Sequence, residues 1–107
     1  MDHERRRAPR YHLVAEAEIV EILSNAKLAA KSSDVSLVGC FMNAASSLPV
    51  GTDIRIQLKR RGVTFTSLGV IARAHPMGMG VSFSKTQKDQ EELLQKWLGE
   101  VKGGAVN

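Results

Sequence analysis

The sequence predicts a single, mainly β domain, an antiparallel barrel or sandwich, followed by one C-terminal α-helix. Apolar and polar residues alternate with a period of two along most of the chain up to about residue 84, and turn-forming residues separate these stretches. After that point, apolar residues recur with the period of a helix. A length of 107 residues with 43% hydrophobic residues is enough for one core, and no repeat or linker suggests a second domain.

The expected strands follow one another without an intervening helix. In "LVAEAEIVEI" (13–22), alanine and isoleucine alternate with glutamate until the pattern ends near residue 20, as it does at a bulge or a strand end. In "DIRIQLK" (53–59), apolar residues again occupy every second position, so each strand has one apolar face. "VTFTSLGVIARA" (63–74) and "GMGVSF" (78–83) supply further strands. The breaks carry turn residues: Leu48-Pro49-Val50-Gly51, Arg61-Gly62 and His75-Pro76-Met77-Gly78.

The last part of the chain predicts the helix. Ser84, with Gln87 three residues later, forms a capping-box pattern that marks a helix start. The apolar residues that follow fall on one helical face: Leu93, Leu94, Trp97, Leu98 and Val101. We therefore expect this helix to pack on the sheet, the folded domain to span residues 12–101, and residues 102–107 to fray.

Positive charge is concentrated in two places. The chain holds fifteen Lys and Arg against eleven Asp and Glu, a formal net charge of +4 that favours an anionic partner without naming one. One basic group is the N-terminal "ERRRAPR" (4–10), with four arginines in seven positions. The other consists of Arg55, Lys59, Arg60 and Arg61, and an acidic group consists of Glu16, Glu18 and Glu21.

The expected location is the cytoplasm. No apolar segment follows the charges of "MDHERRR", and no apolar run approaches the roughly 18 residues of a membrane span. Cys40 is the single cysteine, so an internal disulfide is excluded. We expect Cys40 to be a small buried residue.

The sequence contains no recognisable catalytic motif. His3, His12 and His75 lack the spacing of a metal site, and no Walker loop or GxSxG elbow is present. The GxG of "GMGVSF" lacks the third glycine and the following helix of a phosphate-binding loop. We therefore expect a binding protein that is not an enzyme and that has no metal and no cofactor.

The N-terminal arginines form an extended arm. Pro9 fixes its own φ and disfavours helix at Ala8, so Arg6 and Arg10, four residues apart, do not share a helical face. A guanidinium can bind phosphate oxygens, bind the O6/N7 edge of guanine and stack on a purine face. The arm therefore suits a ligand that offers phosphates and guanines, although a solvated basic tail has the same composition.

A second group of polar residues is "DVSLVG" (34–39), between two strands. Asp34, Ser36 and Gly39 have the spacing D-x-S-x-x-G. An ionised Asp34 suits the N1–H and N2–H donors of guanine, Ser36 can donate or accept, and Gly39 permits close backbone approach. A turn closed by a serine and a glycine would satisfy the same pattern.

Together, the R-x-x-x-R arm, the D-x-S-x-x-G segment and "GMGVSF" before a final helix resemble the PilZ domain family, over about residues 4–98. The resemblance implies a six-stranded antiparallel β-barrel with a flanking helix that binds the bacterial second messenger cyclic di-GMP. The arginines of the family's arm correspond to Arg6 and Arg10. Its D/N-x-S-x-x-G residues correspond to Asp34, Ser36 and Gly39.

This resemblance implies a stand-alone receptor for cyclic di-GMP. The arm, residues 1–11, would be mobile alone, would order over the ligand, and would signal to an unidentified downstream partner protein. Arg5 adds a third guanidinium, so the expected ligand-binding residues are Arg5, Arg6, Arg10, Asp34, Ser36 and Gly39. Family members with a bulky apolar residue at the position of Arg5 hold one ligand, which suggests a pair of ligands here.

Two alternatives remain open from the sequence. A small basic barrel can bind single-stranded nucleic acid, but that needs outward aromatic side chains. Phe41, Phe83 and Trp97 fit core positions, which leaves Tyr11 and Phe65. The other alternative is a protein-interaction adaptor that works without a ligand. Neither a membrane span nor specific nucleic-acid binding is expected.

Overall fold

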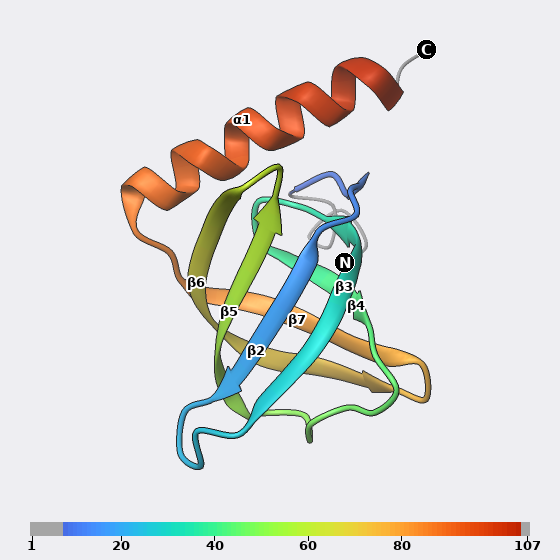
Figure 1. The fold of residues 1–107 in the computed structure, drawn as a ribbon, viewed down its shortest axis with the longest axis vertical. Helices are drawn as coiled ribbons and strands as arrows, with labels where there is room; N and C mark the ends of the chain where they lie inside the picture. Colours follow the sequence, from blue (N-terminus) through green and yellow to red (C-terminus); the bar gives the residue numbers. More distant parts are fainter. Residues whose placement is uncertain (1–7, 106–107) are drawn as a thin grey trace.

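The computed structural model describes the backbone of residues 8–105 and the side chains of residues 8–102. Seven strands precede one helix (Figure 1). Their bounds are β1 Tyr11–His12, β2 Glu16–Glu21, β3 Lys27–Val35, β4 Gly39–Asn43, β5 Asp53–Arg60, β6 Val63–His75, β7 Gly78–Lys85 and α1 Lys88–Ala105. No helix within the described residues is both long and apolar enough to cross a membrane.

Six of the strands close into an antiparallel barrel. The strand order is β1-β3-β2-β5-β6-β7-β4, and a further pairing of β3 with β4 joins the two ends. The short strand β1 is not one of the six barrel strands. It pairs with the end of β3, along the same edge of β3 that pairs with β2. The structure therefore confirms the mainly β fold, the six-stranded antiparallel barrel and the C-terminal helix.

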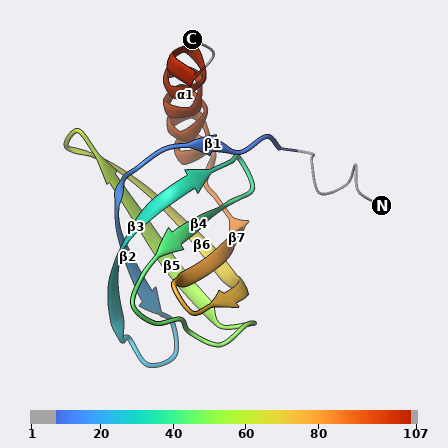
Figure 2. The ribbon, with the colours of Figure 1, turned by 90° about the vertical axis from the view of Figure 1, so that its right-hand side faces the viewer.

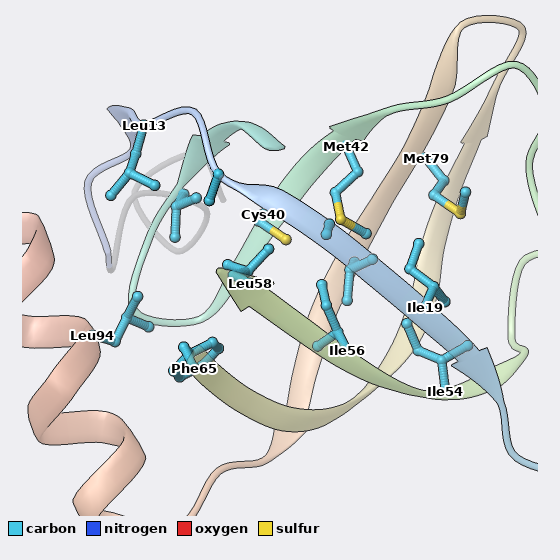
Figure 3. Packing of buried hydrophobic residues seen from close by; sticks show 14 of the residues in the cluster. Leu13, Ile19, Cys40, Met42, Ile54, Ile56, Leu58, Phe65, Met79 and Leu94 are labelled. Atoms are coloured by element: carbon cyan, nitrogen blue, oxygen red, sulfur yellow. The ribbon is translucent and has the colours of Figure 1, made fainter. Parts of the chain in front are cut away.

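The barrel interior is filled by the alternating positions that the sequence predicted. Ile19 of β2 and Ile54, Ile56 and Leu58 of β5 are buried, whereas the charged residues between them face outward. Figure 3 shows these side chains converging with Met42 and Met79 from the other wall of the barrel. Because a fully buried aliphatic side chain contributes about 1.5–3 kcal/mol, the alternation itself selects this sheet register.

Phe65 corrects one expectation. The sequence left it as an outward aromatic, yet its side chain is fully buried. Inward positions in this part of β6 are odd-numbered, so Phe65 points into the core with Ser67 and Ile71. Its ring centroid lies 5.4 Å from that of Phe83 and 6.4 Å from that of Trp97, within the range of favourable aromatic pairs.

Helix α1 covers one open end of the barrel (Figures 1 and 2). Leu94, Trp97 and Leu98 are buried there, as the helical spacing predicted. The capping-box prediction was wrong, because Ser84 belongs to β7 and the helix begins only at Lys88. The Glu91 amide donates to the carbonyl of Gln87, which is the first turn of the helix. At its other end, the helix continues to Ala105, past the expected end at residue 101.

An extra residue separates β1 from β2. Tyr11 pairs with Val35 and Glu16 pairs with Lys31, so a step of five residues on one strand (16 − 11) opposes four on β3 (35 − 31). The buried Ser32 hydroxyl fills this irregularity: it donates to the Leu13 carbonyl at 2.7 Å and accepts from the Ala15 amide at 2.9 Å. Ser32 thereby fixes where β1, and the chain before it, leaves the barrel.

Candidate ligand-binding site

Strand pairing brings the N-terminal segment beside the D-x-S-x-x-G segment. Because His12 pairs with Asp34, the preceding Arg10 lies next to the Asp34 carboxylate. Nε of Arg10 is 3.3 Å from Oδ1 of Asp34, and the two side chains are 54% and 36% exposed. Oδ1 itself is buried and makes no hydrogen bond to any described residue. An ionised oxygen in this position keeps acceptor capacity for a donor from a ligand.

The Ser36 side chain closes the turn between β3 and β4. Its amide donates to the Gly39 carbonyl at 2.8 Å, and its hydroxyl lies 3.3 Å from the same oxygen. The hydroxyl also accepts from the Val38 amide at 3.1 Å. Ser36 is buried, so its side chain is already engaged by the turn. The turn interpretation that the sequence left open therefore holds for this residue.

Position 39 requires glycine, because the backbone of the neighbouring strand β7 approaches it closely. A Cβ at this position would lie 2.2 Å from the Val81 carbonyl oxygen of the neighbouring strand β7. Gly39 pairs with Ser82, so any side chain would push β4 and β7 apart. Ser36 and Gly39 thus shape the turn, whereas Arg10 and Asp34 provide its charged groups.

An open cavity of about 820 Å³ adjoins these residues. It is lined by Ala8, Arg10, Ser36, Val38, Gly39, Cys40, Ala72, Arg73, Val81 and Ser82. The lining comes from the N-terminal segment, the β3–β4 turn and strands β4, β6 and β7. This volume is within the roughly 300–1,000 Å³ of small-molecule sites.

The expected site residues divide into three groups. Arg10, Ser36 and Gly39 line the cavity, and Asp34 is joined to it through its ion pair with Arg10. Arg5 and Arg6 lie outside the described residues. Arg73, an exposed arginine of β6, also lines the cavity, although no sequence motif indicates it.

Cys40 belongs to the cavity lining and is buried, as expected. Burial, with a smaller contribution from the nearby negative charge of Asp34, raises the pKa of its thiol to about 12, and the positive charge of Arg10 opposes this rise. The thiol is therefore protonated at neutral pH and unreactive as a nucleophile.

A second, smaller cavity lies on the other side of the N-terminal segment. It has about 160 Å³ and is lined by Pro9, Tyr11, Leu37, Gln95, Leu98, Gly99 and Lys102. Ala8 and Arg10 therefore face the large cavity, whereas Pro9 and Tyr11 face α1. Figure 2 shows this segment and β1 passing beneath the helix. One short stretch of chain separates the two cavities.

The second basic group lies elsewhere. Arg60 donates to the Glu100 carboxylate of α1 at 2.7 Å, and its guanidinium carbon is 5.9 Å from the centre of the Trp97 ring. Arg61 and Gly62 form the following hairpin turn, both with positive φ (54° and 79°). None of these residues lines the large cavity, so the hairpin contributes to docking of the helix.

The fold and this arrangement are those of a small barrel domain with an open cavity, bordered by charged residues, against its outer wall. The chain belongs to the PilZ domain family: the family model for the PilZ domain matches residues 4–100. A search of curated protein sequences gives no significant match.

Solved structures support the same fold. The PilZ domain of Escherichia coli YcgR, solved with c-di-GMP, has a TM-score of 0.75 at 16% identity, and the match covers 94% of each chain. The PilZ domain of CeSA from a cellulose-synthesizing bacterium has a TM-score of 0.69 at 17% identity, covering 89% of this chain and 96% of that one. The Bacillus subtilis inhibitor of motility, MotI/DgrA, gives 0.72 at 17% identity. There the match covers 87% of this chain but only 48% of the larger protein.

Proposed function

We propose that this chain is a receptor for cyclic di-GMP that works by binding, without turnover, and signals to a partner protein. The observation that carries the proposal is the Arg10–Asp34 ion pair at a cavity of about 820 Å³. Membership of the PilZ family and the likeness to a PilZ domain solved with c-di-GMP support the choice of ligand.

The chemistry of the pair fits the ligand. Cyclic di-GMP offers two phosphates and two guanines in one ring. The Arg10 guanidinium can bind a phosphate or the O6/N7 edge of a guanine. Oδ1 of Asp34, which has no hydrogen bond within the described residues, can accept from N1–H or N2–H of guanine. In this proposal, Ser36 and Gly39 hold the turn that lets the ligand approach.

Arg5 and Arg6 are proposed to order over the bound ligand. Ordering the three residues 5–7 costs about 3–6 kcal/mol at about 1–2 kcal/mol per residue. Two charge-assisted hydrogen bonds return about 1.5–3 kcal/mol each, so the two terms nearly balance. An arm so balanced would close only when the ligand is present, which makes it a switch.

The position of the N-terminal segment suggests how the signal leaves the site. A ligand against Ala8 and Arg10 acts on the same stretch whose Pro9 and Tyr11 contact the cavity beneath α1. The partner would then recognise the closed arm and the surface around it. Because the ligand is an intracellular messenger, the proposal keeps the cytoplasmic location expected from the sequence.

Single-stranded nucleic acid is a poorer fit. The chain has five aromatic residues, and all five lie in the described part. Phe65 and Trp97 are buried, and Tyr11, Phe41 and Phe83 are partly buried. A stacking surface for successive bases needs exposed rings, and this barrel offers none that is fully exposed.

Two ligands per chain are proposed, because Arg5, Arg6 and Arg10 together reduce the repulsion between the phosphates of a stacked pair of dinucleotides. Calorimetric titration of the intact chain with cyclic di-GMP should give a ratio near two, and Arg5→Leu should lower it to one while binding persists. A ratio of one for the intact chain at low and high salt would exclude the paired mode. Weaker binding of Arg5→Leu with an unchanged ratio would assign Arg5 to long-range attraction.

Thermal unfolding with and without ligand tests the receptor itself. At about 100 times the dissociation constant, cyclic di-GMP should raise the unfolding free energy by about 2.7 kcal/mol per site, and cyclic di-AMP should have little effect. Equal shifts with both dinucleotides would contradict guanine recognition. No shift with saturating cyclic di-GMP would overturn the proposal.

A further inference from the structure

A β-bulge turns Arg73 toward the outside of the barrel. Along the preceding part of β6, odd-numbered residues such as Phe65 and Ile71 point into the core. By the same alternation Arg73 would be buried. The register of β6 against β7 shifts between Ile71 and Arg73, since Ile71 pairs with Val81 but Arg73 pairs with Gly80. Both Ala72 and Arg73 are therefore exposed and line the large cavity.

Small residues beside Arg73 leave the surface there without protruding side chains. Gly80 faces it across the strand pair, and a Cβ on Gly80 would lie only 3.4 Å from Cβ of Arg73. Gly39 of β4 and Ser82 of β7 pair directly with each other and extend this surface of small residues toward the β3–β4 turn. A flat ligand can therefore lie on this surface, between the N-terminal segment and β6.

Arg73 also has no charge partner among the residues whose side chains the structure describes. Among residues 8–102, the ion pairs of arginine are those of Arg10 with Asp34 and of Arg60 with Glu100. No described carboxylate lies within ion-pair distance of Arg73. The guanidinium thus stands at the cavity with its donors available.

We propose that Arg73 is a further ligand-binding residue, outside both motif segments, which holds the second end of the anionic dinucleotide through charge-assisted hydrogen bonds. Strands β4 and β7 separate β3 from β6 in the sheet order. Three interstrand steps of about 4.8 Å place Arg73 roughly 14 Å along the wall from the strand that carries Asp34. A dinucleotide can reach both groups if the N–H donors of one guanine face Asp34 and a phosphate or the O6/N7 edge of the other guanine faces Arg73. This inference rests on the proposed cyclic di-GMP function.

Calorimetric titration of the full chain with cyclic di-GMP tests the inference in Arg73→Ala, Arg73→Lys and Arg55→Ala variants. Arg55 is the matched control, because it is an exposed arginine of β5 that does not line this cavity. Arg73→Ala should weaken affinity by 10- to 100-fold, Arg55→Ala by less than about twofold, and Arg73→Lys by an intermediate factor. The thermal midpoints of the ligand-free proteins should agree within a few degrees.

The outcomes separate the two claims. Absence of binding by the unmodified chain would overturn the proposed function and the inference with it. Binding by the unmodified chain with equal losses in Arg73→Ala and Arg55→Ala would overturn the inference alone, because diffuse attraction would then explain both. Should Arg73→Ala fail to fold, the lysine variant decides: unchanged affinity in Arg73→Lys excludes a bidentate contact and contradicts the inference.

Discussion

Within the described part of the chain, an arginine pairs with a carboxylate in two regions, and the surroundings of the two pairs differ. Arg10 and Asp34 meet beside a large open cavity, and the Arg10 side chain is 54% exposed. Arg60 and Glu100 meet between a hairpin and α1, and the Arg60 side chain is only 15% exposed. Trp97, whose ring centre lies 5.9 Å from the Arg60 guanidinium, completes the second region.

The difference shows that Arg10 and Arg60, which both belong to basic groups in the sequence, have different roles in the folded protein. Arg60 has a carboxylate partner and an aromatic neighbour within the protein, so its charge is already paired. Among residues 8–102, Arg10 and Asp34 pair through a 3.3 Å contact, and Oδ1 of Asp34 has no hydrogen bond there, so it keeps its acceptor capacity. Stability should depend on the Arg60 pair, and ligand affinity should depend on the Arg10 pair.

The largest expected effect is on ligand affinity. Arg10→Ala and Asp34→Ala should each weaken binding of cyclic di-GMP by about 100-fold or more, because one or two charge-assisted hydrogen bonds of about 1.5–3 kcal/mol are lost. Unfolding free energy should change by less than about 1 kcal/mol, since the Arg10 side chain is exposed and the Asp34 side chain is partly exposed. Calorimetry and thermal melts measure both, with Asp53→Ala as an exposed-carboxylate control. If either variant unfolds, the residue is structural.

Ser36→Ala should act mainly on the turn. The buried hydroxyl that accepts from the Val38 amide is lost, which costs about 1–2 kcal/mol of unfolding free energy. Affinity should fall only several-fold, because the turn loosens while Asp34 remains. Denaturant unfolding and calorimetry give the two numbers, with the exposed Ser84→Ala as control. An affinity loss as large as that of Asp34→Ala, at normal stability, would contradict this assignment.

Arg60→Ala should show the reverse pattern of Arg10→Ala. Loss of the cation–π contact with Trp97 and of the packed side-chain stem should cost about 1 kcal/mol, which corresponds to a few degrees in thermal midpoint. Binding of cyclic di-GMP should change by less than about twofold. Lys59→Ala, the exposed neighbour, is the control. Strong loss of binding in Arg60→Ala would move the ligand site to the hairpin and favour nucleic acid.

The smallest expected effect is a pH dependence at Glu100. The hydrogen bond from Arg60, together with the positive charges of Arg60, Lys96 and Arg61, lowers the pKa of its carboxyl below the ordinary 4.5, while desolvation opposes this. A carboxyl whose folded pKa is lowered stabilises the protein above the unfolded pKa, and this contribution disappears as the pH falls through the folded pKa. Thermal midpoints of the intact chain and Glu100→Gln should therefore differ at pH 7 and converge in acid. A difference that stays constant would contradict the assignment.

Much of the fold follows from the sequence because one face of each strand is buried. The alternation in β2 and β5 assigns Ile19, Ile56 and Leu58 to the core without further information. The outward position expected for Phe65 was wrong, because the odd-numbered residues of β6 from Phe65 to Ile71 face the core and the residues between them face outward. The S-x-x-Q pattern at Ser84 was misleading, because β7 extends through this residue to Lys85 before the helix begins.

The candidate site is predictable only in part. Arg10 and Asp34 were expected together from their motifs, and strand pairing places them 3.3 Å apart. Arg73 could not be found in this way, because its exposure depends on a bulge opposite Gly80 that reverses the alternation. The structural tasks of Ser36 and Gly39 likewise depend on a three-residue turn and on the approach of the Val81 carbonyl.

The most direct test of this account is calorimetric titration with cyclic di-GMP of three proteins under the same conditions: the intact chain, Arg10→Ala and Arg60→Ala. We predict that the intact chain and Arg60→Ala bind with closely similar affinity and that Arg10→Ala shows little or no binding. Absence of binding by the intact chain, or a loss confined to Arg60→Ala, would contradict the account.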